Sequence, residues 1–304
     1  MAMLQGIIDI GSNTIRMAVY LIEGNHFEQL MKRKATVGLA SYVKEGVMQP
    51  EGIERAVETL LEYKRFLHCF KINRVAAFTT AALRNAKNSR EAVAAIEERT
   101  GIKIQVISGD EEATFDFIGA THNLQNDSGL LIDIGGGSTE IVTYRDRQIQ
   151  YKTSLPIGSL SFASKYVKDV LPTMQECMDM HGEAEATIAA ASDFISISEA
   201  EIVGIGGTFK GACALNNELF NLPAANRRLE TKNIRSIIGN FVSDLGMTQE
   251  MSITLMRSVP ERLNTIIPGL IIASVLSRRF QSHWITYSDS GVREGYIYDQ
   301  IMGK

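Results

Sequence analysis

The sequence contains few cysteines and no long apolar run. Its three cysteines, Cys69, Cys177 and Cys213, are far apart and form neither a C-x-x-C pair nor a metal-binding spacing, which predicts a reducing compartment. The longest apolar run, residues 266–276, is interrupted by a proline and a glycine and is too short to span a bilayer. The N-terminus lacks a basic region followed by an apolar stretch, so no signal peptide is expected. These absences predict a cytoplasmic protein that does not bind a membrane.

The chain also has little net charge. Its formal net charge is −4 over 304 residues, which gives no global reason to expect a nucleic-acid partner. A polyanionic substrate would instead need a local basic patch. With 45% hydrophobic and 22% charged residues, the chain has the composition of a folded globular protein, and its length allows two ordinary domains or one large one.

Residues 131–140, Leu-Ile-Asp-Ile-Gly-Gly-Gly-Ser-Thr-Glu, combine an apolar strand with an acid, three glycines and two hydroxyls. Consecutive glycines let the backbone turn tightly and approach a ligand. The N–H groups of such a turn, with Ser138 and Thr139 beside them, can hold phosphate. Asp133 next to a phosphate suggests a bridging metal ion. The alternative is a hairpin with a Gly-rich bend and one buried, hydrogen-bonded Asp.

The same pattern occurs 124 residues earlier, in residues 6–21. One gapless offset aligns Asp9 with Asp133, Gly11 with Gly135, Thr14 with Ser138, Arg16 with Glu140 and Tyr20 with Tyr144. An internal repeat predicts two domains of like topology, and strands that alternate with helices predict an α/β fold. We expect domains at 1–124 and 125–304, separated by the polar residues 123–128, with the two turns facing each other across a phosphate-binding cleft. The C-terminal helix is expected to pack back on the first domain.

Helix signals are clear in the first domain. Residues 50–70 begin with Pro50 and repeat apolar residues at helical spacing, and residues 89–100 form a second predicted helix that ends at Gly101.

A third glycine turn occurs at residues 202–211, Ile-Val-Gly-Ile-Gly-Gly-Thr-Phe-Lys-Gly. A strand followed by Gly206, Gly207 and Thr208 at the start of a helix can bind phosphate through N–H groups and the threonine hydroxyl. The alternative is a turn that only allows a strand and a helix to pack closely.

Residues 108–111 can be interpreted in two ways. Ser108 and Glu111 fit the S-x-x-E capping box, in which each side chain binds the backbone N–H of the other residue. Alternatively, Glu111 is a carboxylate at a strand-to-helix junction that points into the cleft. Glu112 projects about 100° away from Glu111 on a helix, so at most one of them is expected to act.

Several motifs resemble those of a known family. Two Asp-bearing glycine turns and a G-x-G-G-T turn resemble the sugar kinase/Hsp70/actin superfamily. Within it, the exopolyphosphatase and guanosine pentaphosphate phosphohydrolase (Ppx/GppA) family is most similar. The matching segments follow the family order, at residues 8–17, 79–88, 106–113, 133–140, 203–208 and 288–295.

The resemblance implies two ribonuclease H-like (actin-like ATPase) domains. It also implies hydrolysis of a terminal phosphoanhydride, with release of orthophosphate from inorganic polyphosphate or guanosine pentaphosphate. Mg²⁺ is the implied cofactor and a homodimer is compatible with the family. A phosphotransferase and a non-catalytic sensor of polyphosphate or an alarmone are the competing hypotheses.

The family's site residues transfer to matching positions. Glu111 is implied as the general base, Glu140 as a second catalytic acid and metal ligand, and Asp133 as the magnesium-associated acid. These roles agree with a reaction that needs an oriented water and fixed phosphate contacts. A surface or inter-domain salt bridge is the alternative for Arg16 and Arg84. The phosphate-binding residues implied are Gly11, Ser12, Asn13, Thr14, Arg16, Arg84, Gly136, Gly137, Ser138, Thr139, Gly206, Gly207 and Thr208.

The chain departs from the family pattern at two positions. Many members have an arginine in a Val-Arg-Leu-Gly segment, whereas the matching residues 35–39 contain none, with Thr36 among them. Residues 262–265 read Arg-Leu-Asn-Thr, so Asn264 stands where an acid is common. These changes could alter chain-length preference or lower activity. The further helical domains of longer members are not present in the sequence, which favours short polyphosphates or a nucleotide as substrate.

Overall fold

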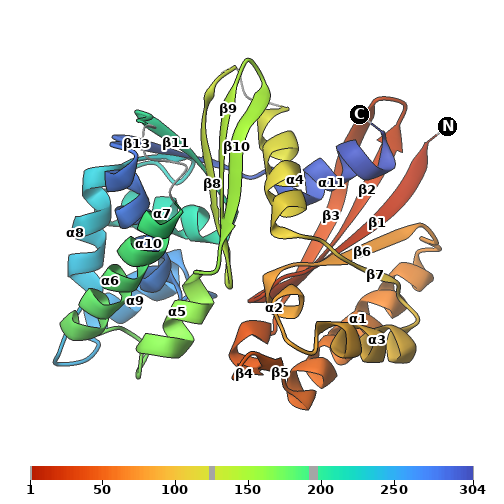
Figure 1. The fold of residues 1–304 in the computed structure, drawn as a ribbon, viewed down its shortest axis with the longest axis horizontal. Coiled ribbons are helices and arrows are strands. Elements are labelled where there is room, and N and C mark those ends of the chain that lie inside the picture. The colour runs from red at the N-terminus through yellow and green to blue at the C-terminus, as the bar shows by residue number, and fades with distance from the viewer. Residues whose placement is uncertain (1, 123–126, 192–197, 304) are drawn as a thin grey trace. The chain divides into compact units, whose positions relative to one another are not determined.

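The computed structural model describes residues 2–122, 127–191 and 198–303. The chain divides into two compact units (Figure 1). Unit 1 comprises Met1–Glu112 with Met302–Lys304, and unit 2 comprises Ala113–Ile301. The division falls inside helix α4 (Gly109–Thr121). The boundary predicted between residues 124 and 125 lies outside the described residues.

Unit 1 contains a five-stranded sheet in the order β3-β2-β1-β6-β7. The first three strands are antiparallel neighbours, whereas β6 runs parallel to β1 and β7 parallel to β6. The strand bounds are β1 (Met3–Ile10), β2 (Thr14–Glu23), β3 (His26–Thr36), β6 (Val75–Thr79) and β7 (Ile104–Val106), with a separate hairpin of β4 (Val43–Lys44) and β5 (Val47–Met48).

Helices α1 (Pro50–Cys69) and α3 (Ser89–Thr100) lie on one face of this sheet (Figure 1). Pro50 begins α1, where a missing N–H costs nothing. Gly101 ends α3 with φ 66°, a left-handed conformation that glycine adopts without strain, so both predicted helices are confirmed. The core between helices and sheet includes Ile8, Ile15 and Leu60. Two short helices, η1 (Leu39–Tyr42) and α2 (Ala81–Arg84), follow β3 and β6.

Unit 2 repeats this topology. Its sheet has the order β10-β9-β8-β11-β13-β12, and again three antiparallel strands are followed by two parallel ones, with β12 added antiparallel to β13 at the edge. Asp9 pairs with Arg16 across β1 and β2, and Asp133 pairs with Glu140 across β8 and β9. The predicted α/β fold with two domains of related topology is therefore confirmed. The bounds are β8 (Gly129–Ile134), β9 (Thr139–Arg145), β10 (Gln148–Leu155), β11 (Glu201–Ile205), β12 (Arg228–Glu230) and β13 (Trp284–Ser288).

Helix α10 (Ile266–Arg279) is the centre of the unit 2 core. It contains the longest apolar run of the sequence and contacts four other helices. On the other face of the sheet, Ala113, Phe117 and Ala120 of α4 pack against Leu131 and Val142. The other helices are α5 (Ser159–Tyr166), α6 (Met174–Ala190), α7 (Gly206–Leu219), α8 (Thr231–Phe241), α9 (Gln249–Ser258), α11 (Val292–Tyr296) and the π-helix η3 (Ile297–Ile301).

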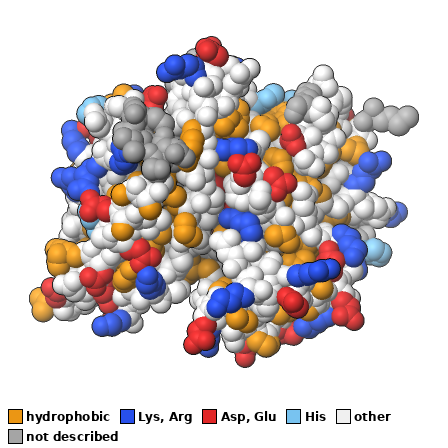
Figure 2. Space-filling view, viewed as in Figure 1, with side chains coloured by type: hydrophobic (Ala, Val, Ile, Leu, Met, Phe, Trp, Pro, Cys, Tyr) orange, Lys and Arg blue, Asp and Glu red, His pale blue; other side chains and the backbone are white. Residues whose placement is uncertain are grey.

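The surface carries charges of both signs. On the face shown in Figure 2, Lys and Arg side chains are interspersed with Asp and Glu, as the small net charge of −4 suggests. Among the described residues, no helix is both long enough and apolar enough to cross a membrane.

Candidate active site

The first glycine turn of each unit is closed by the same hydrogen bond. The Gly11 N–H donates to the Thr14 carbonyl at 3.1 Å, and the Gly135 N–H donates to the Ser138 carbonyl at 2.9 Å. Within the described ranges, the N–H groups of Ser12, Asn13, Gly136 and Gly137 donate to no other residue. These N–H groups are therefore suited to bind an anion.

The helix that follows the third strand, η1 in unit 1 and α5 in unit 2, donates a hydrogen bond to each turn. In unit 1 the Ala40 N–H donates to the Ser12 carbonyl at 3.0 Å, and in unit 2 the Leu160 N–H donates to the Gly136 carbonyl at 2.9 Å. A Cβ at Gly158 would lie 2.5 Å from the Gly136 carbonyl carbon, so only glycine permits this approach. The start of α5 is thereby held against the turn.

The hydroxyls of the turns are buried. Ser12, Thr14 and Ser138 are at most 7% exposed, and the buried Thr139 hydroxyl donates to the Ile157 carbonyl at 2.7 Å. The Thr139 hydroxyl therefore already donates its proton to a hydrogen bond within the protein. The phosphate contacts predicted for these four side chains stay predictions.

The third turn packs directly against Asp133. Gly206 has φ +81°, and a Cβ there would lie 2.4 Å from Asp133 Oδ1. The Thr208 hydroxyl is buried and donates to the Ile134 carbonyl at 2.8 Å. The structure therefore supports the close-packing interpretation of this turn, while the phosphate contacts predicted for Gly206, Gly207 and Thr208 stay predictions.

Unit 1 has an equivalent of Thr208 that the sequence did not reveal. The Thr79 hydroxyl donates to the Ile10 carbonyl at 3.0 Å, and Ile10 is the counterpart of Ile134 in the repeat. Thr79 ends β6 without a following glycine, so the only sequence signal was a threonine at the end of a buried strand.

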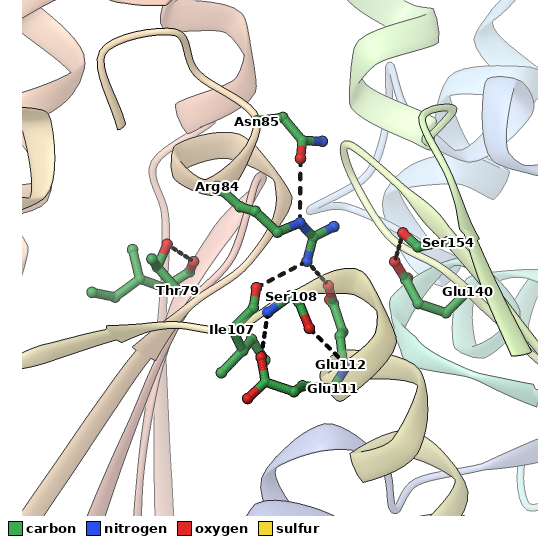
Figure 3. Close-up of polar contacts among 10 residues, drawn as sticks. Thr79, Arg84, Asn85, Ile107, Ser108, Glu111, Glu112, Glu140 and Ser154 are labelled. Carbon is green, nitrogen blue, oxygen red and sulfur yellow. Dashed lines mark hydrogen bonds and ion pairs between the residues drawn. The ribbon is translucent and has the colours of Figure 1, made fainter. Parts of the chain in front are cut away.

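Asp133 and Glu140 form a pair of carboxylates on adjacent strands. Glu140 is 1% exposed, and its Oε1 accepts a hydrogen bond of 2.7 Å from the Ser154 hydroxyl (Figure 3). Asp133 is partly exposed. Among the described residues, no group of three or more His, Cys, Asp or Glu side chains could enclose a metal. Two carboxylates suit Mg²⁺, which commonly completes its coordination with water and substrate phosphate oxygens.

Arg16 lies at the position of Glu140 in the repeat, as predicted. Its Nη1 is 3.1 Å from Asp9 Oδ2, and the Arg16 side chain is 31% exposed whereas that of Asp9 is 3% exposed. Arg16 thus forms a salt bridge within the unit 1 sheet, and its partner is buried, whereas the sequence had suggested a surface or inter-domain salt bridge as the alternative to phosphate binding. The Arg16 side chain is only partly buried, and a phosphate contact by Arg16 stays a prediction.

The capping box at the start of α4 is confirmed. The Ser108 N–H donates to Glu111 Oε2 at 2.7 Å, and the Glu111 N–H donates to Ser108 Oγ at 3.1 Å (Figure 3). The Glu111 side chain is exposed. The cap therefore fixes the side chain of the predicted base without burying it, and its role as a base stays a prediction.

Glu112 points elsewhere and binds Arg84. Arg84 Nη1 is 2.5 Å from Glu112 Oε2, and the two side chains are 13% and 11% exposed. Arg84 also donates to the Ile107 carbonyl at 3.4 Å and to Asn85 Oδ1 at 3.2 Å (Figure 3). The predicted phosphate ligand Arg84 is thus held within unit 1 by three neighbours.

Sequence reasoning did not include Arg262 among the site residues. A Cβ at Gly207 would lie 1.7 Å from Arg262 Nη2, so the Arg262 guanidinium lies against the backbone of the third turn. Arg262 precedes α10 and is far from the turn in sequence. No local pattern could have placed it there.

Proteins with similar sequences match nearly the whole length of this chain. The exopolyphosphatase 1 of Mycobacterium tuberculosis is 24% identical over 97% of this chain and 88% of its own length. A putative exopolyphosphatase of Haemophilus influenzae is 28% identical over 96% of this chain and 89% of its own length.

Solved structures of similar fold also match nearly the whole chain. The Aquifex aeolicus PPX-GPPA enzyme is 27% identical with a TM-score of 0.74, covering 98% of this chain and 99% of that chain. An exopolyphosphatase from Cytophaga hutchinsonii is 21% identical with a TM-score of 0.86, covering 99% of this chain and 98% of that chain, which shows a shared fold.

The family model described as the Ppx/GppA phosphatase family matches residues 18–303. That range includes most of both sheets, the glycine turn of unit 2 and the capped start of α4. The chain therefore belongs to the Ppx/GppA phosphatase family.

Proposed function

We propose that this protein hydrolyses the terminal phosphoanhydride bond of inorganic polyphosphate and releases orthophosphate. The observation that carries the proposal is the pair of equivalent glycine turns beside charged cross-strand pairs. In each turn, two backbone N–H groups donate to no residue in the described part of the chain. The relatives named exopolyphosphatases support this substrate class.

Phosphate binding is assigned to the backbone of the turns. Phosphoryl transfer depends mainly on positioning and on electrostatic stabilisation of the phosphoryl oxygens. In the proposal, the N–H groups of Ser12 and Asn13 serve unit 1 and those of Gly136 and Gly137 serve unit 2. The exposed part of Arg16 adds a cation in unit 1.

Water activation is assigned to Glu111. Its carboxylate accepts a proton from water as the water oxygen bonds to the terminal phosphorus. The bridging P–O bond then breaks, and the shortened chain leaves with the bonding electron pair. The capping bond from the Ser108 N–H, 2.7 Å long, orients this carboxylate, which is the positioning that a general base requires.

Magnesium is proposed as the cofactor, with Asp133 and Glu140 as its protein ligands. When bound, a divalent ion polarises phosphoryl oxygens and offsets their charge. The Ser154 hydroxyl orients the Glu140 carboxylate, and the approach of Gly206 to Asp133 limits the movement of that side chain.

The role of Glu111 can be tested separately from its role in the cap. Glutamine also serves in a capping box, so E111Q should keep the helix start but abolish release of orthophosphate. S108A removes only the capping hydroxyl, at about 1 kcal/mol of stability, and should retain most of the activity. If E111Q kept near-normal rates while E112Q lost them, the base would be Glu112.

The substrate is tested by measuring orthophosphate release from tripolyphosphate, long polyphosphate, guanosine pentaphosphate and ATP, with Mg²⁺ or with EDTA. Release from tripolyphosphate that EDTA abolishes is the expected result. Faster release from guanosine pentaphosphate would identify the nucleotide as the substrate, and release unchanged by EDTA would contradict the metal assignment. Tight binding of polyphosphate without any release would favour a sensor, and phosphate transfer to an added nucleoside diphosphate would favour a phosphotransferase.

A further inference from the structure

Equivalent rows of side chains cross the first three strands of each unit. In unit 1, Asp9, Arg16 and Lys34 lie directly opposite one another on β1, β2 and β3. In unit 2, Asp133, Glu140 and Ser154 do the same on β8, β9 and β10. Each row begins two residues before the first glycine of its turn, so both rows have the same place relative to the proposed phosphate site.

The two rows differ in charge. The row of unit 2 holds two carboxylates and a hydroxyl, and the hydroxyl donates to Glu140 at 2.7 Å. The row of unit 1 holds one carboxylate and two cations, with Arg16 Nη1 3.1 Å from Asp9 Oδ2. The formal charges of the row therefore sum to −2 in unit 2 and to +1 in unit 1, which favours a cation beside the row of unit 2 and an anion beside the row of unit 1.

Lys34 is at the accessible end of the unit 1 row. Its side chain is exposed, whereas Asp9 is buried and Arg16 is partly buried. Residues directly opposite on antiparallel strands have Cβ atoms about 5 Å apart, and like charges at that spacing destabilise a sheet. Two cations at this distance are suited to an anion with several charges, since it can interact with both.

We propose that Lys34 is a further substrate-binding residue, which together with Arg16 binds a phosphoryl group of an oligophosphate chain. This inference rests on the proposed function, because it concerns the same turn and the same class of substrate. The inference also assigns to unit 1 the preference for oligophosphate chains over orthophosphate. An orthophosphate bound at the turn has no second phosphoryl group that could contact Lys34.

The competing explanation is that Lys34 protects the edge of the sheet from pairing with other chains. β3 is an edge strand of its sheet, and lysines on such strands prevent pairing with other chains. Lys32 provides a matched control. It lies two residues away on the same face of the same strand, but its cross-strand partner is Ala18.

The test compares K34Q and K32Q in the full chain. Tripolyphosphate and orthophosphate are titrated by calorimetry, and KM and kcat for tripolyphosphate are then measured. A hydrogen bond to a charged group is worth about 1.5 kcal/mol or more, so K34Q should weaken tripolyphosphate binding and raise KM by about tenfold. The kcat of K34Q, its orthophosphate affinity and all constants of K32Q should change by less than about twofold.

The titration does not require turnover, so it separates this inference from the proposed function. A wild-type chain that binds tripolyphosphate without hydrolysing it would contradict the proposed function, while the difference between K34Q and K32Q would still decide the role of Lys34. Equal effects of the two substitutions on tripolyphosphate binding, or no effect of either, would overturn the inference and leave edge protection.

Discussion

At the start of α4, two adjacent glutamates have separate tasks. Glu111 is exposed and binds the backbone of Ser108, whereas Glu112 is buried and binds Arg84 at 2.5 Å. The angle of about 100° between consecutive helical side chains explains the separation. Glu111 therefore remains accessible for chemistry, while Glu112 links the helix start to the end of α2.

Removing one partner of the Arg84–Glu112 pair should be strongly destabilising, because the other charge would be left buried without its partner. We expect R84M to lower the free energy of unfolding by about 3 kcal/mol, measured by urea denaturation. Adding E112Q to R84M should restore part of the loss, because the two side chains interact directly.

The control for this prediction is an exposed pair in the same unit. Arg55 and Glu58 are 3.1 Å apart with both side chains 55% exposed, so R55M should change stability by less than about 0.5 kcal/mol. Equal losses in R84M and R55M would contradict a structural role for the buried pair.

At the scale of elements, α4 and α11 approach each other through glycines of unit 2. A Cβ at Gly295 would lie 1.8 Å from the Phe115 carbonyl oxygen, and one at Gly119 would lie 2.2 Å from the Gly291 carbonyl oxygen. The neighbours are backbone atoms, which cannot move aside as a flexible side chain can. Close backbone packing at this crossing therefore requires glycine.

G295A should accordingly destabilise unit 2 by about 1–3 kcal/mol, the usual cost of overpacking. The matched control is G182A in α6, where a Cβ would meet nothing within 4 Å and alanine should stabilise the helix by about 0.5–1 kcal/mol. Thermal unfolding of both variants gives the comparison, and a melting temperature of G295A at or above that of the wild type would show that the crossing can relax.

At the scale of the whole molecule, each unit has its own hydrophobic core, one on the α1 and α3 side of the first sheet and one centred on α10. The cysteines are divided between the units. Cys69 of unit 1 is exposed, and Cys177 and Cys213 of unit 2 are buried. Burial raises the pKa of the Cys177 thiol to about 11 and that of the Cys213 thiol to about 12.

These raised pKa values predict a loss of stability in alkali. Above the ordinary thiol pKa of about 8.5, the unfolded chain releases protons that the folded chain still holds. The unfolded state then binds fewer protons, so the free energy of unfolding falls as pH rises. We expect the melting temperature to fall from about pH 8.5 up to the folded-state thiol pKa values of about 11 and 12. Below about pH 9 the thiols dominate this fall, because tyrosines ionise near pH 10.

The variant C213A removes one of the two buried thiols, so its melting temperature should fall less steeply with pH than that of the wild type. A slope unchanged by C213A would show that other groups cause the alkaline loss. Thiol labelling at neutral pH gives a second readout, with Cys69 reacting in the folded chain and the other two only after unfolding.

Local patterns were sufficient for much of this structure. The equivalence of Asp9 with Asp133 and of Arg16 with Glu140 followed from one gapless repeat, and each pair of equivalent residues has the same register in its sheet. The end of α3 at Gly101 and the Ser108–Glu111 cap depend only on neighbouring residues. Sequence alone therefore determined two related domains, the two glycine turns and the capped glutamate.

Tertiary structure decided the contacts between segments that are distant in sequence. Arg262 against Gly207, Arg84 with Glu112, and the row that brings Lys34 opposite Arg16 all depend on how separate elements pack or pair. An arginine or a lysine has the same local signature whether it faces solvent, a carboxylate or a glycine turn. Only the folded chain distinguishes these environments, because burial and strand pairing are properties of the packed elements and not of the sequence around each residue.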